Sequence, residues 1–440
     1  MPALPNHERD EYVQPKRPAA SAPSSGRLRR LLFFLGLMGP GLIAAIAGDD
    51  AGGVATYATV GASYGYQMLW ALVLMTVSLS LVQEMSTRLG AVTGQGLADL
   101  IRERFGIRWT AVSILALVVA NGATTVSEFA GVAAALELVG VTRYISVPLA
   151  ALAVWILVVW GSYHRVEKVF LAMTLAFLAY PLTVFLIKPD WGEIGQAIVS
   201  PSIAFSTNYL ITLVALLGTT ITPYMQIYAQ SATAEKEVDL EHYNWERWDA
   251  YIGAFLSDLF AFFIIVTTAA TLFPRGIQIQ TASDAAMALV PLAGPAAEIV
   301  FALGLLGASF LAAGVLPLAT AYPISEALGL ERGVSRTFQQ APFFMGIFTG
   351  LIVLGAGITL IPGLPLIPLL ILAQVINGVL LPVVLISIVR LAGSKELMGS
   401  FANGRVYGVL GWMTVVVVSI LSVTMVLVSL LGLFGINLGG

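Results

Sequence analysis

The sequence predicts an all-α integral membrane protein of about eleven transmembrane helices, built as an inverted 5+5 repeat with one extra helix. Apolar residues make up 58% of the 440-residue chain and charged residues only 11%, whereas soluble domains carry about a quarter charged residues. The apolar residues lie in runs of 18 or more, long enough to span a bilayer. The first and sixth runs are broken near residues 48–53 and 218–224, which is typical of inverted-repeat transporters.

The first 26 residues differ from the rest of the chain. They are rich in Pro, Ala, Ser and charge and contain no apolar run, so we expect residues 1–26 to form a disordered cytoplasmic tail. They lack the short apolar core and cleavage site of a secretory signal. We therefore expect the transmembrane domain to occupy residues 27–440.

The predicted spans follow the apolar runs in order. In lipid every backbone polar group needs a partner within the protein, so such runs must be helices. The spans are placed at 31–61, 67–89, 110–139, 144–161, 166–187, 204–232, 249–273, 296–328, 341–361, 364–391 and 405–434. Residues 31–187 would form the first repeat and residues 204–391 the second, and 405–434 would be the additional helix.

The basic residues predict the orientation of the chain. Cytoplasmic loops carry an excess of Lys and Arg. With the N-terminus inside, only Arg143, Lys188 and Arg275 of the 22 basic residues fall outside. Eleven spans then place the C-terminus outside. The short termini and the lack of an organelle signal point to the inner (plasma) membrane of a bacterium.

Two adjacent carboxylates, Asp49 and Asp50, lie at the break in the first span. Charged groups inside a membrane are costly unless they pair or face a water-filled cavity. No Lys or Arg lies near the middle of a predicted span, so a cation or a proton is the natural partner. The alternative is that these residues cap a half-helix, which is a common role of Asp.

The second interruption carries Thr219, Thr222 and Tyr224 around Pro223. Proline breaks a helix because it lacks an N–H and clashes with the preceding turn. Hydroxyls and unwound carbonyls supply the oxygen atoms that hard cations bind. The alternative for the threonines is a hydrogen bond to a carbonyl of their own helix.

Three further polar residues lie inside predicted spans. Glu128, midway along the third span, is either a proton or ion relay or a buried structural carboxyl. Gln374 and Asn377 are three residues apart and share a face of the tenth span. They either line the substrate site or hydrogen-bond between helices.

Several stretches together resemble the natural resistance-associated macrophage protein (Nramp) family of divalent-metal transporters. The likeness runs across most of residues 34–391. It is carried by Gly39-Pro40-Gly41, Asp50-Ala51-Gly52-Gly53, Gln83-Glu84 with Arg88-Leu89-Gly90, Thr93-Gly94, Leu97-Ala98, Glu128 with Gly131, Glu167-Lys168-Val169, Pro223, and Ala373-Gln374-Val375 with Pro382. The resemblance implies ten core helices of the amino-acid/sodium-symporter type and a cation site between the two broken helices.

The chain departs from the family pattern at both breaks. The family's first break reads Asp-Pro-Gly-Asn, in which the Asp and the Asn bind the metal; Asp50 matches the Asp, and Gly53 replaces the Asn. The second reads Ala-x-x-Met-Pro-His, and Thr219 and Thr222 replace the Ala and the Met. Met225 follows closely and would restore a sulfur if the register shifts by one to three residues.

These departures predict a hard ion as the substrate. Thioether sulfur selects softer metals, whereas carboxylate, carbonyl and water suit Mg²⁺, Ca²⁺ and Mn²⁺. Asp49, Asp50, Thr219 and Thr222 are the predicted metal ligands, and Gly53 is expected to leave room for a partly hydrated ion. The chain thus resembles the magnesium-transporting branch related to the family, with Mg²⁺ or Mn²⁺ as cargo and no other cofactor.

Proton coupling is predicted to be weak or absent. In the family, a His in the second broken helix and an Asp before the third-span Glu help to carry protons; the matching positions are Tyr228 and Thr125. The three histidines, His7, His164 and His242, lie in the tail or the loops. A side chain that titrates near neutral pH is therefore missing from the predicted spans.

Two other classes of function stay open from the sequence. A secondary transporter of a small organic solute, such as an amino acid or amine, would use the same architecture, because fold does not fix function. A receptor or an enzyme is the other class, although the chain has no Cys and no phosphate-binding loop. The expected partners are the cation and the bilayer, without nucleic acid, and the sequence does not indicate the oligomeric state.

Overall fold

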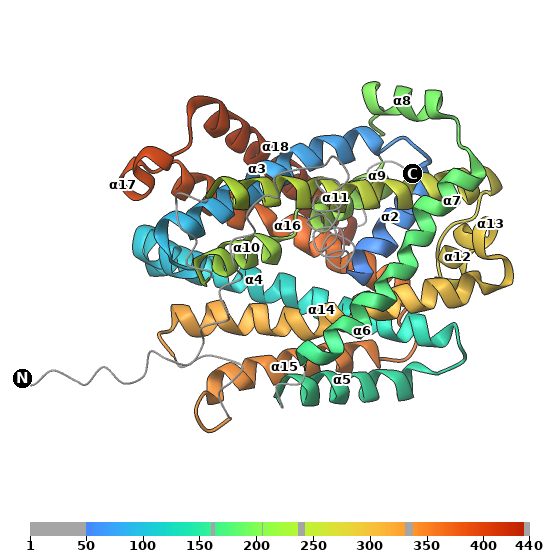
Figure 1. Cartoon of the computed structure of the whole chain (residues 1–440), viewed down its shortest axis with the longest axis horizontal. Helices are drawn as coiled ribbons and strands as arrows, with labels where there is room; N and C mark the ends of the chain where they lie inside the picture. The colour runs from blue at the N-terminus through green and yellow to red at the C-terminus, as the bar shows by residue number, and fades with distance from the viewer. Residues whose placement is uncertain (1–49, 160–162, 205, 236–242, 331–337, 435–440) are drawn as a thin grey trace, which may run out of the picture. The chain divides into compact units, whose positions relative to one another are not determined.

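A computed structural model describes residues 50–159, 163–204, 206–235, 243–330 and 338–434, and all regular elements in these ranges are helical (Figure 1). The long helices are α2 (Ala51–Tyr64), α3 (Leu69–Thr93), α4 (Leu97–Glu137), α5 (Arg143–Val159), α6 (Tyr163–Thr174), α9 (Thr207–Thr220), α10 (Pro223–Glu235), α11 (Tyr243–Thr271), α14 (Ala297–Ala327), α15 (Pro342–Thr359), α16 (Leu366–Ala392) and α18 (Arg405–Leu433). The shorter ones are α7 (Ala179–Ile187), α8 (Trp191–Val199), α12 (Ala282–Ala286), α13 (Val290–Ala293) and α17 (Lys395–Met398). The predicted tail, Asp49 and the first half of the first span lie outside the described residues.

The described helices match the predicted spans closely. Nine helical stretches are long and apolar enough to cross a membrane, and α5 is a shorter apolar helix at the position of the fourth predicted span. The helix α2 corresponds to the second half of the first predicted span. The fifth span consists of α6 and α7, joined by a 3₁₀ turn at Leu175–Leu178. Hydropathy therefore located most of the described membrane helices to within a few residues, with the start of α4 as the main exception.

The start of the third span is where the prediction differs most from the structure. The sequence places it at residue 110, but α4 is helical from Leu97 and bends at Gly106, where φ is 78° and ψ is 174°. Glycine adopts this left-handed conformation without the steric cost that a side chain would add. The segment before the bend carries several charged residues. Its mean hydropathy is therefore too low to predict the part of the helix that leads into the span.

The short helices lie at the ends of the long ones. Figure 1 shows α17 at one end and α8, α12 and α13 at the other. None of these four was predicted, because helices of four to nine residues are too short to register as membrane spans. Their separation agrees with loops that alternate between the two sides of a bilayer.

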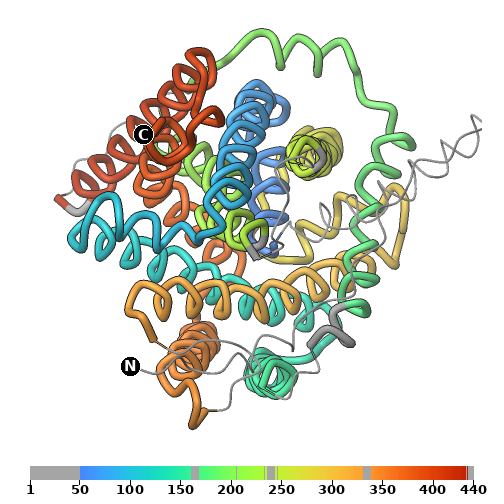
Figure 2. The backbone as a smooth tube through the Cα atoms, turned by 60° about the vertical axis from the view of Figure 1, so that its left-hand side comes forward, coloured from blue at the N-terminus to red at the C-terminus, as the bar shows by residue number. Residues whose placement is uncertain are grey.

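The centre of the described fold is formed by α4, α14 and α16. The helix α14 packs along α4, α16 packs on both α4 and α9, and α11 packs on both α2 and α3 (Figure 2). The helix α18 is the least buried of the nine candidate spans, as expected for an additional helix on the outside of a ten-helix core. This packing brings α2, α9 and α16 together.

A buried ion pair fixes the end of α3. Arg88 Nη2 lies 3.3 Å from Glu84 Oε2, and Arg88 Nη1 donates to Phe401 O at 2.8 Å. The Tyr243 hydroxyl donates to Glu84 Oε1 at 2.6 Å. Burial and the Glu84 carboxylate raise the pKa of Tyr243, so this hydroxyl keeps its proton. The network ties α3 to α11 and to the segment before α18, which is a structural role for the Glu84 and Arg88 motif.

Candidate functional site

Asp50 stands immediately before α2, at the predicted break. Its backbone is extended (φ −69°, ψ 171°), and Oδ1 accepts a hydrogen bond from Gly53 N at 2.5 Å. Asp50 is thus the N-cap of α2, the capping role that the sequence left as an alternative. A carboxylate here also faces the positive end of the helix dipole. The side chain is only 5% exposed, so the capping carboxylate is enclosed by the protein.

Two amide side chains on α16 connect Asp50 to α4. Gln374 Nε2 donates to Oδ1 and Oδ2 of Asp50 at 3.0 and 3.2 Å. Asn377 Nδ2 donates to Gln374 Oε1 at 2.9 Å and to Thr124 Oγ1 at 3.0 Å. The pair therefore hydrogen-bonds between helices and also contacts the candidate carboxylate. Thr124 was not among the predicted residues; its position one turn before Glu128 was the only signal.

The second interruption lies at residues 221–222. The helix α9 ends at Thr220 and α10 begins at Pro223, because proline lacks an N–H and disfavours a helical conformation in the residue before it. The Thr222 hydroxyl is buried and donates to Thr219 O at 2.9 Å. The Thr222 hydroxyl therefore has the alternative role considered from the sequence, a hydrogen bond to a nearby carbonyl. Its oxygen keeps lone pairs that can still accept a hydrogen bond.

The helices α9 and α16 touch through their backbones next to this interruption. A Cβ atom on Gly218 would lie 2.0 Å from Gln374 O and 2.4 Å from Gly378 N. A Cβ atom on Gly378 would lie 2.4 Å from Val214 O. Only glycine permits so close an approach. The contact sets the spacing between the end of α9 and the helix that carries Gln374.

Gly53 does not leave the open space expected from the sequence. A Cβ atom there would lie 2.8 Å from Thr219 Oγ1 and 3.2 Å from Asp50 Oδ1. The hydroxyl from α9 and the carboxylate before α2 therefore border the same small volume. Thr219 is 9% exposed, and within the described ranges its hydroxyl makes no hydrogen bond.

Glu128 lies against the first turn of α2. Its Oε2 accepts from Ala51 N at 3.4 Å, and the side chain is fully buried. Its Oε1, together with Ser127 Oγ and Ser309 Oγ, has no hydrogen-bond partner among the described residues. The structure thus places Glu128 against Ala51, the residue that follows Asp50. It also adds Ser127 and Ser309 to the cluster, two residues that sequence reasoning missed.

The remaining predicted residues are more loosely connected to this cluster. Tyr224 is half-buried at the start of α10, and Asp49 is outside the described residues. Tyr228 is 57% exposed on α10, and the Thr125 hydroxyl donates to Asn121 O at 2.7 Å. Neither Tyr228 nor Thr125 therefore shows a connection to Asp50.

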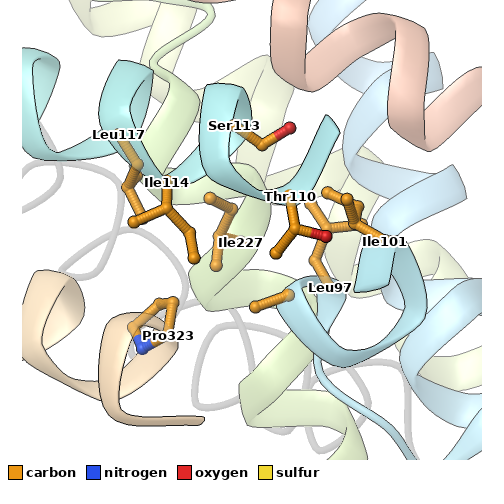
Figure 3. A pocket seen from close by; sticks show the side chains of 9 residues that line it. Leu97, Ile101, Thr110, Ser113, Ile114, Leu117, Ile227 and Pro323 are labelled. Carbon is orange, nitrogen blue, oxygen red and sulfur yellow. The ribbon is translucent and has the colours of Figure 1, made fainter. Parts of the chain in front are cut away.

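A separate pocket lies between the first half of α4, α10 and α14 (Figure 3). It is lined by Leu97, Ala98, Ile101, Thr110, Ser113, Ile114, Leu117, Ile227 and Pro323. The lining contains two hydroxyls and no carboxylate, so a cation would find no charged ligand there. The cluster around Asp50 is the better candidate for a cation site.

The oxygen atoms that a cation could share at this cluster are those of the Asp50 carboxylate and the Thr219 hydroxyl. Among the described residues, no three His, Cys, Asp or Glu side chains gather as metal ligands. What gathers instead is one carboxylate, the Thr219 hydroxyl and the amide group of Gln374, whose nitrogen donates to the carboxylate; the Thr222 hydroxyl is bonded to Thr219 O. Such a site would bind a cation with one charged ligand and several neutral oxygens, with Glu128 close behind.

The interruption between α9 and α10, the start of α2 at a buried carboxylate and the likeness to solved transporters define a membrane protein of the amino-acid/sodium-symporter fold type. MhsT, solved in complex with L-phenylalanine, shares this fold at a TM-score of 0.59 and 14% identity, over 88% of this chain and 97% of that one. The manganese transporter of Eremococcus coleocola is more similar, with a TM-score of 0.75 and 21% identity over 95% of this chain and 91% of that one. The predicted fold class is confirmed.

The chain belongs to the natural resistance-associated macrophage protein-like (Nramp) family, whose profile matches residues 41–428. The divalent metal cation transporter MntH of Yersinia pestis is 30% identical over 399 residues, which covers 87% of this chain and 93% of that protein. The MntH protein of Yersinia pseudotuberculosis matches to the same extent. The resemblance noted from the sequence is therefore confirmed.

Proposed function

We propose that this protein transports a divalent metal cation, which binds between the start of α2 and the interruption between α9 and α10. The observation that carries this proposal is the environment of Asp50. The carboxylate is 5% exposed, and among the described residues no Lys or Arg pairs with it. A buried charge without a partner is strongly unfavourable, so a bound cation is its natural complement. The Yersinia relative is a divalent metal cation transporter and the Eremococcus protein a manganese transporter, which supports the same class of substrate.

We propose further that the ion is hard, either Mg²⁺ or Mn²⁺. The site offers the Asp50 carboxylate and the Thr219 hydroxyl as oxygen ligands, and such oxygens suit these ions better than soft metals. Mg²⁺ keeps several of its waters and uses one or two protein carboxylates, and one carboxylate is present here. Met225 is half-buried on α10.

Competition in reconstituted liposomes tests the choice of ion. Because the donors are oxygens, an excess of about tenfold of Mg²⁺ is expected to suppress Mn²⁺ uptake at least as well as the same excess of Cd²⁺. Protein-free liposomes supply the background. A marked preference for Cd²⁺ over both hard ions would show that a soft ligand takes part and would refute the hard-ion assignment.

Transport is expected to proceed with weak or no proton coupling. The positions that would carry protons hold an exposed Tyr228 and a Thr125 whose hydroxyl is bonded to Asn121 O, and the sequence places no His in a predicted span. A pH-sensitive dye inside the liposomes should therefore report no acidification that follows metal uptake. Acidification that rises with uptake would contradict this and would direct attention to Glu128.

Family membership disfavours the organic-solute alternative, although MhsT shows that this fold accepts an amino acid. It also favours transport over catalysis. We place the protein in a bacterial plasma membrane with a cytoplasmic N-terminus and an external C-terminus. This rests on its bacterial relatives and on the 22 basic residues, of which three face outward in that orientation.

A further inference from the structure

Gly53 and Thr219 face each other where α2 packs against α9. A Cβ atom on Gly53 would lie 2.8 Å from Thr219 Oγ1, closer than real Cβ atoms approach other heavy atoms, and 3.2 Å from Asp50 Oδ1. A side chain at residue 53 and a hydroxyl at residue 219 in its present position therefore exclude each other. The absence of a side chain at residue 53 is what allows this hydroxyl to stand beside the Asp50 carboxylate.

The Thr219 hydroxyl is used differently from several nearby threonine hydroxyls. Thr220 on the same turn also lacks a hydrogen-bond partner among the described residues, but Thr219 is the one that borders Gly53. The hydroxyls of Thr212, Thr222 and Thr124 donate to carbonyls of their own segments, the common role of threonine in helices. Thr219 makes no such bond within the described part of the chain. Its oxygen borders the same small volume as the Asp50 carboxylate, close to the interruption between α9 and α10, which is where a ligand to a cation bound by Asp50 would stand.

We propose that Gly53 and Thr219 form a reciprocal pair that sets the ion site: the Thr219 hydroxyl is a neutral oxygen ligand supplied by α9, and Gly53 is the residue that admits it. The inference rests on the proposed function. The sequence pattern agrees with it, because the family's larger side chain at the first break and smaller one at the second are exchanged here. Restoring Asn at residue 53 alone should therefore displace the hydroxyl and add no working ligand.

The ligand role is tested first with two substitutions that differ in whether the hydroxyl is kept. Thr219→Ser keeps the hydroxyl, whereas Thr219→Val keeps the shape of the side chain and removes the oxygen. Thr219→Ser is expected to retain Mn²⁺ and Mg²⁺ uptake, and Thr219→Val to bind Mn²⁺ about tenfold more weakly by calorimetry, the scale of one lost polar interaction. Equal binding by these two variants would overturn the ligand role.

Reciprocity is tested with double substitutions. Gly53→Asn should abolish most uptake, and adding Thr219→Ala should restore it by clearing the space beside residue 53. The matched control adds Thr220→Ala to Gly53→Asn, because Thr220 is a buried neighbour on the same turn of α9 and is not the residue that borders Gly53. The control should not restore uptake. Rescue by both alanines alike, or by neither, would overturn the pairing.

The outcomes distinguish a failure of this inference from a failure of the proposed function on which it rests. If the unsubstituted protein takes up neither Mn²⁺ nor Mg²⁺ in liposomes, the proposed function itself fails. If it takes up metal while Gly53→Asn transports as well as the unsubstituted protein, the function stands and the reciprocal pair is refuted. Thermal unfolding of each purified variant shows whether a loss of uptake reflects the site or the fold.

Discussion

Replacing Asp50 with alanine is expected to reduce metal uptake to the level of protein-free liposomes. The carboxylate is the charged ligand at the candidate site, where Gln374 holds both of its oxygens. Its removal leaves neutral oxygens alone to replace the hydration shell of a divalent ion, and the cost of dehydration is then not recovered. Uptake of Mn²⁺ and Mg²⁺ into proteoliposomes measures the effect.

The Asp50→Asn variant separates charge from helix capping. Asparagine is as good an N-cap as aspartate, so it should preserve the start of α2 and the stability of the protein while it still abolishes uptake. Asp50→Ala loses the cap as well, at a cost of about 1 kcal/mol of stability. Substantial uptake by Asp50→Asn would show that the carboxylate is structural, and the cation site would then have to be sought elsewhere.

Gly218→Ala is expected to destabilise the protein strongly. The added methyl group would lie 2.0 Å from Gln374 O and 2.4 Å from Gly378 N, and both atoms belong to the backbone of α16, which cannot rotate away. Forcing two packed helices apart costs about 1–3 kcal/mol or more. Movement of α16 would also shift Gln374 away from Asp50, so uptake should fall together with the unfolding temperature in detergent.

The control for this prediction is Gly346→Ala in α15. A Cβ atom on Gly346 would meet nothing within 4 Å, and alanine is about 1 kcal/mol more favourable than glycine inside a helix. This variant should therefore unfold at the same or a slightly higher temperature and transport normally. If Gly218→Ala proves as stable as Gly346→Ala, the close contact between α9 and α16 is wrong.

The amino-acid sequence by itself determined the membrane helices and the place of their interruptions. A membrane helix needs about 20 apolar residues, so the segments that contain α3, α9, α11 and α16 appear in the sequence as long apolar runs. Pro223 ends one helix and begins the next through its own covalent structure. The same reasoning missed α8 and the first turns of α4, because short or charged helices carry no hydropathy signal.

Only the tertiary structure decided which of the candidate residues meet. Gln374 bonds to Asp50 across 324 positions of sequence, and the Thr219 hydroxyl lies beside the place that a Cβ atom on Gly53 would take. The sequence predicted an empty space at Gly53, whereas the packing of α2 on α9 fills it with a hydroxyl. Local patterns fix helices because their hydrogen bonds join near neighbours, but contacts between helices depend on how side chains of distant segments fit together.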